Sequence, residues 1–207
     1  MKILGLDTTR KNALVFIVDS GDDKKAKVFE TGENIKHSEG IFLFIEKLLV
    51  ETGLSMEEID AFACIVGPGS FTGIRVGMSI IKGFSKVYGK PVIALNMFDV
   101  LKSSLKNGII LLNSTSTSCY YSKVDKSQLG ESGVVEKDKI SQLGGNGEVV
   151  VLEEEQKVIG VEYNNCKIID NLDSYIVAAI KARLNSMDYG EFVPYYLQLS
   201  QAERNLK

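Results

Sequence analysis

The feature that most constrains this chain is the segment Val66–Gly77, whose sequence is VGPGSFTGIRVG. Two glycines flank a proline directly after an apolar run, which forces a tight turn in which backbone segments can approach closely. After the turn, apolar residues recur at helical spacing as far as Tyr88, and Gly89 ends the pattern. The segment therefore predicts a strand, a tight turn and an amphipathic helix capped by Thr72. The strand-to-helix turn itself consists of Gly67, Pro68 and Gly69.

The residues around this turn predict an α/β fold. Apolar runs before it predict an antiparallel meander of three strands, a helix and a fourth strand, and a fifth strand and a further helix follow it. The expected strands are Lys2–Asp7, Ala13–Val18, Lys27–Phe29, Ile59–Val66 and Val92–Leu95, and the other expected helices are Ile35–Thr52 and Met97–Leu105.

The second half of the chain repeats this βββαβαβα order loosely, in a stretch richer in glycine, serine and charge. The change falls between Asn96 and Asn107, so we expect two subdomains, residues 1–100 and residues 101–207. In the second subdomain the expected strands are Gly108–Asn113, Cys119–Val124, Val134–Val135 and Val149–Leu152, and the expected helix is Leu172–Leu184.

The charge and cysteine content argue against several classes of protein. The net charge is -3 and no long run of lysine or arginine is present, so we expect another subunit to hold any nucleic acid. The three cysteines are far apart and form no CxxC pair, which indicates a reduced, cytoplasmic protein without a zinc knuckle. The first residues read as a strand and not as a signal peptide. The stretch Ile41–Val50 is too short and too charged to span a bilayer.

Histidine is the most informative residue count, because His37 is the only one. A metal site that needs two histidines cannot be built within one such chain, which excludes the HExxH zinc proteases. A Ser-His-Asp or Cys-His arrangement would have to use His37, and no GxSxG turn is present to supply its partner.

A second motif lies at the end of the first strand, where Asp7, Thr8 and Thr9 follow an apolar run. An aspartate and hydroxyl groups in a hairpin after such a strand can face a phosphate and a metal ion. The same residues also suit a turn in which the threonine side chains bond the local backbone. The sequence alone leaves both interpretations open.

The string Val66–Gly77 resembles the signature of the TsaB family, formerly called YeaZ. The resemblance covers Met1–Leu101 and returns at Pro194–Leu197 and Gln201–Glu203. Where many relatives carry Tyr-Leu-Arg near the end, this chain has Gln198 in place of the arginine.

The resemblance implies the fold of actin, hexokinase and Hsp70, called the ASKHA fold, with two subdomains of mixed sheet plus helices. It also implies a degenerate paralogue of TsaD, the catalytic subunit, which binds a metal through two histidines spaced HxxxH. Met97 and Leu101 stand at the corresponding positions here, and neither side chain can hold a hard divalent metal. The implied chain is not an enzyme and has no catalytic residue, metal or cofactor, with ATP and metal on its partner subunits.

The resemblance further implies a scaffold subunit that supports TsaD in forming N6-threonylcarbamoyladenosine at position 37 of tRNAs that read A-starting codons. The chain would pair with TsaD as a heterodimer, join the ATPase TsaE in a ternary complex, and form a homodimer when alone. It would meet tRNA only through the complex and would not bind a membrane. His37, which begins a His-Ser-Glu sequence, would cap a helix or contact a partner.

We expect the partner surface to be formed by the two long helices of the first subdomain. The first has apolar residues on two sides, and the apolar arc of the second is wider than one core face needs. Glycines at positions 73 and 77 lie one helical turn apart, where another helix could pack closely. The expected interface residues are Ile41, Leu43, Ile45, Leu48, Gly73, Ile74, Val76, Gly77, Ile80, Ile81 and Phe84.

Three alternatives stand beside this interpretation. The first is a stand-alone nucleotide-binding ATPase or kinase-like enzyme of the same fold, in which Asp7, Thr8 and Thr9 form a working phosphate loop and not a vestigial one. The others are a glycoprotease, against which the single histidine argues, and a homodimeric structural protein. Gly144–Gly147 could cradle a phosphate, but we interpret it as a plain turn.

Overall fold

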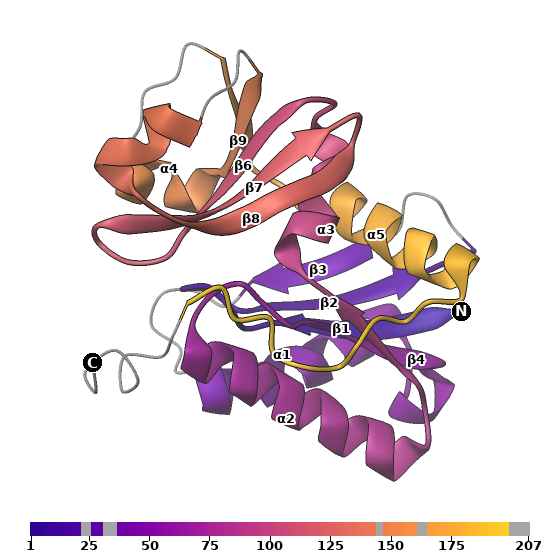
Figure 1. The fold of residues 1–207 in the computed structure, drawn as a ribbon. Helices are drawn as coiled ribbons and strands as arrows, with labels where there is room; N and C mark the ends of the chain where they lie inside the picture. The colour runs from indigo at the N-terminus through magenta and orange to yellow at the C-terminus, as the bar shows by residue number, and fades with distance from the viewer. Residues whose placement is uncertain (22–25, 31–36, 144–146, 161–164, 199–207) are drawn as a thin grey trace. The chain divides into compact units, whose positions relative to one another are not determined.

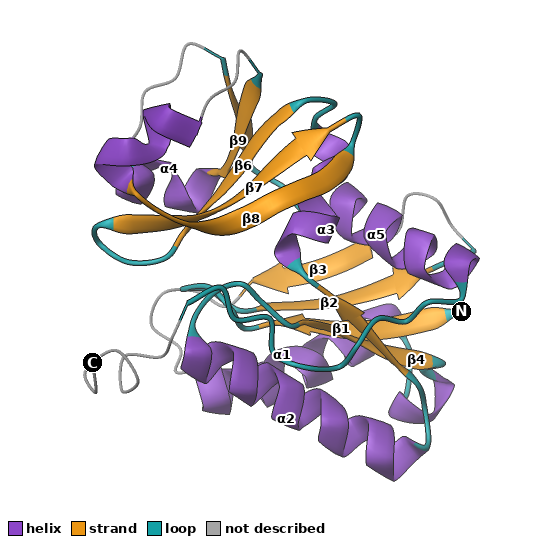
Figure 2. Cartoon of the chain, in the orientation of Figure 1, coloured by secondary structure: helices purple, strands orange, loops and turns teal. Residues whose placement is uncertain are grey.

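The computed structural model describes residues 1–21, 26–30, 37–143, 147–160 and 165–198 (Figure 1). Within them the strands form two five-stranded sheets, accompanied by helices (Figure 2). The chain divides into two compact units. Met1–Met97 with Ile176–Tyr195 form unit 1, and Phe98–Tyr175 with Tyr196–Lys207 form unit 2. The α/β class predicted from the sequence is confirmed.

The sheet of unit 1 has the strand order β3-β2-β1-β4-β5. β1, β2 and β3 pair antiparallel in sequence, whereas β4 runs parallel to both β1 and β5. The strands are β1 (Lys2–Asp7), β2 (Leu14–Asp19), β3 (Ala26–Glu30), β4 (Ala61–Ile65) and β5 (Val92–Leu95). The predicted three-stranded meander and the two strands after it are therefore confirmed.

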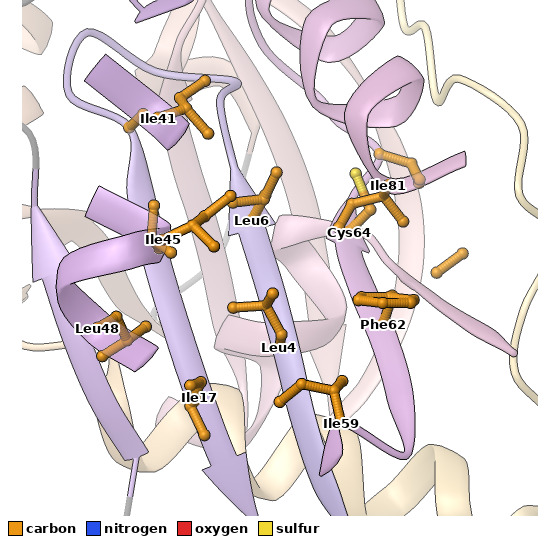
Figure 3. Packing of buried hydrophobic residues seen from close by; sticks show 14 residues of the cluster. Leu4, Leu6, Ile17, Ile41, Ile45, Leu48, Ile59, Phe62, Cys64 and Ile81 are labelled. Atoms are coloured by element: carbon orange, nitrogen blue, oxygen red, sulfur yellow. The ribbon is translucent and has the colours of Figure 1, made fainter. Parts of the chain in front are cut away.

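Two helices, α1 (His37–Thr52) and α2 (Phe71–Tyr88), cover one face of this sheet (Figure 1). In Figure 3, Ile45 of α1 points toward Leu6 of β1, and Ile81 of α2 lies beside Cys64 of β4. These side chains are at most 4% exposed. Their burial removes apolar surface from water, which is the main force that holds the two helices on the sheet.

The opposite face of the sheet is also buried. Ile3, Phe16 and Ile65 point away from α1 and α2 and are fully buried. A sheet covered on both faces needs apolar side chains at consecutive positions, which explains why β1 and β4 read as apolar runs and not as strict alternation. A 3-10 turn, η1 (Met56–Glu58), leads from α1 to β4 and is closed by a capping box between Ser55 and Glu58.

The sheet of unit 2 has the strand order β10-β9-β6-β7-β8. A small core joins Ile109 and Leu111 of β6 to Ile140 and Ile159 from the helical segments. The strands are β6 (Gly108–Asn113), β7 (Ser118–Asp125), β8 (Gln128–Glu136), β9 (Glu148–Leu152) and β10 (Cys166–Ile169). The remaining helical elements are α3 (Met97–Leu101), η2 (Lys102–Ser104), η3 (Lys137–Leu143), α4 (Glu153–Ile159) and α5 (Asp173–Ser186).

The two sheets have the same topology. Reading β6 for β1, β7 for β2, β8 for β3, β9 for β4 and β10 for β5 reproduces both the strand order and every parallel or antiparallel pairing. The chain therefore contains one structural unit built twice. The loose repetition predicted for the second half of the sequence corresponds to this duplication.

The units differ from the predicted division at residue 100. One break along the chain lies between Met97 and Phe98, but the segment Ile176–Tyr195 returns to unit 1. Backbone hydrogen bonds explain this return, because the Ala94 amide donates to the Tyr189 carbonyl at 2.7 Å and the Tyr195 amide donates to the Val66 carbonyl at 2.8 Å. No periodic pattern follows α5 in the sequence, so this pairing could not be predicted.

Several predicted boundaries are wrong in the second half. The helix expected over Met97–Leu105 ends as α3 at Leu101 and continues only as the 3-10 turn η2. Val134–Val135 proves to be part of the longer strand β8. The helix α4 and the strand β10 were missed, and α4 reads EEEQKVI with only Glu155 and Ile159 buried, too few for a periodic signal. At the first helix, the expected start Ile35 lies outside the described residues.

Candidate functional site

The turn after β1 is closed by its own side chains. Asp7 Oδ1 accepts hydrogen bonds from the Thr9 amide at 2.8 Å and from the Thr9 hydroxyl at 2.7 Å. Arg10 Nε and Nη2 donate to Asp7 Oδ2 at 3.1 and 3.0 Å. Asp7, Thr8 and Thr9 are at most 2% exposed. Both carboxylate oxygens of Asp7 are thus engaged within the chain, and the Arg10 guanidinium balances their charge.

The glycine-rich turn packs directly on this loop. The Ser70 amide donates to the Thr9 carbonyl at 2.8 Å, and the Thr8 hydroxyl donates to the Gly73 carbonyl at 2.6 Å. A Cβ atom at Gly73 would overlap the Thr8 carbonyl oxygen, and one at Gly69 would overlap the Thr9 carbonyl oxygen. Glycine is therefore required because the start of α2 lies against the backbone of the loop. The motif that opens α2 serves to close the turn after β1.

The cap of α2 differs from the prediction. Ser70 is the N-cap residue, and its hydroxyl accepts a hydrogen bond from the Gly73 amide at 3.2 Å. Thr72 is the second residue inside the helix and is exposed. The prediction was wrong because Ser70 and Thr72 both suit an N-cap position, and the sequence does not show at which residue the turn ends and the helix begins.

The two stretches that carry the family resemblance meet in unit 1. Tyr195 bonds Val66 through the backbone, and a Cβ atom at Gly67 would lie 2.5 Å from the Tyr195 carbonyl oxygen. The Gly67 carbonyl accepts a hydrogen bond from the Met97 amide at 2.9 Å. Residues from three distant parts of the sequence thus pack around the predicted strand-to-helix turn, whose Gly67–Pro68 peptide bond is cis.

The positions matched to metal-binding histidines carry buried apolar side chains. Met97 is 1% exposed and Leu101 is fully buried. Among the residues that the structure describes, no three His, Cys, Asp or Glu side chains are grouped so that they could hold a metal ion. His37 is the first residue of α1.

An apolar surface lies on the outer side of α1 and α2. Phe42 is 52% exposed and Leu43 is 65% exposed, although both are large hydrophobic side chains. The Phe42 ring meets the Phe84 ring edge to face, with their centroids 6.3 Å apart. We call this surface the helix face. It consists of Phe42, Leu43 and Val50 from α1 and Val76, Ile80, Phe84 and Val87 from α2.

Two shallow hollows indent the helix face. One has a volume of about 330 Å³ and is lined by side chains that include Phe42, Leu49 and Phe84. The other, of about 460 Å³, is lined by Phe42, Arg75, Val76 and Ile80 among others. Phe42 borders both hollows. Exposed apolar surface with such indentations is typical of sites where anchor side chains of another protein are inserted.

Only part of the predicted interface lies on this surface. Leu43, Val76, Ile80 and Phe84 do, whereas the prediction of direct partner contact is wrong for the others, which are buried in the core of unit 1. These buried residues are Ile41, Ile45, Leu48, Gly73, Ile74, Gly77 and Ile81. The two glycines face inward, toward Thr8 and not toward another helix.

The sequence reasoning missed Phe42, Val50 and Val87 as members of the helix face. The signal was the run of five consecutive apolar residues Ile41–Ile45, which extends around more than one full turn of a helix, so that part of it must face away from a single core. Val50 is 75% exposed and stands seven residues after Leu43, so the two side chains lie on the same outer side of α1. Which apolar side of each helix faces the core and which faces solvent depends on the packing of the folded chain, and the sequence does not show that packing.

Gln198, the position that departs from the family pattern, has a structural role in unit 2. Its Nε2 donates to the Ser114 hydroxyl at 2.9 Å and to the Tyr120 hydroxyl at 2.7 Å. Of the other matched or glycine-rich segments, Gln201–Glu203 and residues 144–146 of Gly144–Gly147 lie outside the described residues. No helix in the described ranges combines the length and the apolar character needed to cross a membrane.

Sequence comparisons connect the chain to two kinds of protein. The family model of TsaD, described as tRNA N6-adenosine threonylcarbamoyltransferase, matches residues 33–135. The TsaB protein of Haemophilus influenzae, described as a tRNA threonylcarbamoyladenosine biosynthesis protein, is 28% identical over 130 residues, which cover 60% of this chain and 54% of that protein. The Escherichia coli TsaB protein is 31% identical over 96 residues, 46% of this chain and 40% of that protein.

Structural comparison covers nearly the whole chain. YeaZ from Pseudomonas aeruginosa matches with a TM-score of 0.72 and 17% identity, over 95% of this chain and 99% of that one. The chain is related to the TsaB (YeaZ) family. It has the predicted ASKHA-type fold, which EutJ from Carboxydothermus hydrogenoformans shares at a TM-score of 0.52 and 12% identity, over 92% of this chain and 90% of that one.

The sequence match to these relatives is partial. It spans about half of the Haemophilus influenzae TsaB protein. The threonylcarbamoyltransferase of Kosmotoga olearia is 29% identical over 110 residues, which cover 46% of this chain but only 33% of that enzyme.

Proposed function

We propose that this chain is a non-catalytic subunit that binds a TsaD-type tRNA N6-adenosine threonylcarbamoyltransferase through the helix face. In this role it supports the formation of N6-threonylcarbamoyladenosine at position 37 of tRNAs that read A-starting codons. The observation that carries the proposal is a contrast within unit 1. The polar groups of Asp7–Thr9 are hydrogen-bonded within the chain, whereas apolar side chains of the helix face are exposed to solvent.

The closed turn supports a role without catalysis. A carboxylate that is to hold a metal-bound phosphate needs free oxygen atoms directed at the ligand. Here the Asp7 carboxylate accepts hydrogen bonds from Thr9 and Arg10, and the Thr8 hydroxyl donates to the Gly73 carbonyl. We therefore propose that this chain uses no nucleotide or metal of its own at Asp7–Thr9 and that ATP and metal belong to its partner subunits.

The helix face supports binding of a protein. Phe42, Leu43, Val50 and Val87 leave apolar surface in water, which a partner would remove from solvent. The relatives named above are described as TsaB proteins or as a threonylcarbamoyltransferase. We take the transferase as the partner in a heterodimer, with TsaE joining that pair, tRNA reached through the complex, and a homodimer as the state of the chain alone.

Sedimentation velocity of the chain, of the transferase encoded in the same genome, and of their mixture tests the proposal. A faster-sedimenting species in the mixture is the expected result. Phe42→Glu places a charge between the two hollows and should abolish that species, because a desolvated unpaired charge is costly in an apolar interface. Val158→Glu on α4 is the matched control, since Val158 is 51% exposed and Phe42 is 52% exposed.

Modified tRNA gives the functional readout. Threonylcarbamoyladenosine formation by the reconstituted system should depend on this chain, should fail with Phe42→Glu and should persist with Val158→Glu. Separate boundaries for the wild-type chain and the transferase, with ATP present, would refute the proposal and would favour a stand-alone role for the turn at Asp7–Thr9.

A further inference from the structure

A small pocket of unit 1 shares no lining residue with the helix face. It has a volume of about 190 Å³. Its walls come from the carboxyl ends of two parallel strands, at Val66 after β4 and at Ala94 of β5, and from the segment that follows α5. We call this segment, residues 187–195, the strap. In α/β sheets, ligands bind preferentially outside the carboxyl ends of parallel strands, so the pocket lies where a ligand is expected.

The strap is fixed to the two strand ends by hydrogen bonds. The Ala94 amide donates to the Tyr189 carbonyl at 2.7 Å, and the Tyr195 amide donates to the Val66 carbonyl at 2.8 Å. Gly190 has a φ of +74°, and a Cβ atom there would lie 2.8 Å from the Ala94 carbonyl oxygen, so glycine is what lets the strap approach β5 this closely. The pocket is therefore preformed, and little conformational entropy is lost when a ligand enters it.

The volume of the pocket limits the size of its ligand. Pockets that hold cofactors and drug-sized molecules have volumes of about 300–1,000 Å³. The pocket beside the strap, at about 190 Å³, lies below that range. It is too small for a nucleotide and suits a molecule of a few heavy atoms or a single side chain.

The charged side chains that line the pocket leave it with a negative charge. These side chains are Arg183 and Glu191. The Arg183 guanidinium is paired with the Asp188 carboxylate, with Nη1 at 3.0 Å from Oδ2, so its charge is balanced within the chain. Glu191 is exposed, and its carboxylate has no ion pair among the residues that the structure describes. An unbalanced carboxylate at a small pocket favours a positively charged ligand.

The other walls of the pocket fit a short carbon chain that ends in a cation. Val66, Ala94 and Val193 supply apolar surface, and the first two are at most 5% exposed. Tyr195 adds an aromatic side chain, and aromatic rings attract cations. Apolar walls with an aromatic and a carboxylate group beside them are suited to an alkylammonium ion.

We propose that this pocket binds a small aliphatic cation, a primary ammonium group on a short carbon chain, with Glu191 as its counter-charge. A free amine and the lysine side chain of a protein both carry this group. Because the pocket and the helix face have no residue in common, this site is independent of the proposed function.

Probes that share one carbon chain and differ in charge test the proposal. Butylammonium, butyrate and butan-1-ol are each titrated into isotope-labelled protein at about pH 7, where the amine is protonated. The backbone amide signals of Ala94, Asn96 and Gly190 report on the pocket in NMR spectra. Butylammonium should shift these signals with a dissociation constant of about 1 mM, and the other two probes should bind about 10-fold more weakly.

A lysine with a blocked main chain, Nα-acetyl-lysine methylamide, distinguishes the two sources of the ammonium group. Binding as strong as that of butylammonium would show that the pocket accepts a lysine side chain of a protein. Binding of butylammonium without binding of the blocked lysine would identify a free amine as the ligand. Either result supports an ammonium site.

The variant Glu191→Gln removes the charge and keeps the size of the side chain. It should weaken butylammonium binding by about 10-fold. Glu153→Gln, at the exposed glutamate that begins α4, makes the same change of net charge and should bind like the wild type. Val193→Trp should abolish binding because the larger side chain fills the pocket, and its position is 54% exposed, so the fold should tolerate it. Thermal unfolding verifies that each variant is folded.

Three results would each overturn the inference. They are the absence of shifts at the pocket amides with both amine probes, equal binding of butyrate or butan-1-ol, and equal binding of butylammonium by Glu191→Gln and the wild type. None of them affects the sedimentation experiment with Phe42→Glu, so failure of the ammonium site leaves the proposed function as it stands.

Discussion

Replacement of Gly73 by alanine tests whether the glycine-rich motif closes the turn after β1. The added Cβ would overlap the carbonyl oxygen of Thr8, which belongs to the backbone and cannot rotate away. It would also disturb the hydrogen bond of 2.6 Å from the Thr8 hydroxyl to the Gly73 carbonyl. The matched control is Gly83→Ala in the same helix, because a Cβ at Gly83 would meet nothing within 4 Å.

The magnitudes follow from three terms. Alanine is favoured over glycine inside a helix by about 1 kcal/mol, and this gain applies to both variants. Overpacking at Gly73 costs about 2–3 kcal/mol, and the weakened hydrogen bond costs about 1 kcal/mol more. Gly73→Ala should therefore destabilise the protein by about 2–3 kcal/mol, and Gly83→Ala should stabilise it by about 1 kcal/mol.

Thermal unfolding followed by circular dichroism measures the difference. For a chain of 207 residues, about 1 kcal/mol corresponds to a shift of about 2–4 °C in Tm. Gly73→Ala should lower Tm by about 5–10 °C, while Gly83→Ala should raise it by about 2–4 °C. Gly77→Ala should fall between them, since its Cβ would meet only the Thr8 hydroxyl. Equal shifts for Gly73→Ala and Gly83→Ala would refute the close packing of α2 on the turn.

Three further outcomes are expected. Arg10→Met should destabilise the chain by about 3 kcal/mol in urea unfolding, because it leaves the buried Asp7 carboxylate without its cation, and Lys11→Met, at an exposed neighbour, should not. Gln198→Ala should lower stability by about 1–2 kcal/mol through loss of the bonds to Ser114 and Tyr120, a loss that Ser114→Ala should partly reproduce. Burial raises the pKa of the Cys119 thiol from 9.0 to about 11. Because the thiol ionises at lower pH in the unfolded chain than in the folded one, the stability that comes from burying the neutral thiol is complete below pH 9. It is lost as the pH rises toward 11. The stability difference between wild type and Cys119→Ala in urea should therefore be smaller at about pH 10.5 than at about pH 8, and an unchanged difference would contradict the assigned burial.

The order of elements in unit 1 was predictable because its strands and helices are long and strongly apolar. β5 falls on the predicted residues Val92–Leu95, and β1 on Lys2–Asp7. The periodic pattern of α2 likewise gave its end at Tyr88. Unit 2 was harder because its elements are short and half polar. α4 buries only two of its residues, and β10 has four residues, of which only Ile169 is buried.

The candidate site was predictable only in outline. Sequence periodicity identified two helices with more apolar surface than one core needs, and the structure places Leu43 and Ile80 of that set on the helix face. Periodicity could not show that Ile41 and Ile74 enter the core, because each helix has more apolar residues than one core face needs. The hydrogen bonds that close Asp7 and Thr8 depend on contact with α2, which lies far away in the sequence.

The glycines of the motif and the apolar residues that follow them lie on one side of α2 but have different roles. Gly69, Gly73 and Gly77 bring α2 so close to the turn that the Thr8 and Thr9 backbone occupies the space beside the helix start. This close approach fixes the rotation of α2 about its axis, because only the glycine side of the helix can lie against the turn. Ile80 stands seven residues after Gly73, only about 20° from it around the helix. The glycine side of α2 therefore continues beyond the turn as an apolar side, where Val76 and Ile80 line one hollow together with Phe42. The motif that closes the candidate phosphate site is thus also what orients the surface proposed to bind the partner, and a change at Gly73 should affect partner binding through this orientation without any direct contact.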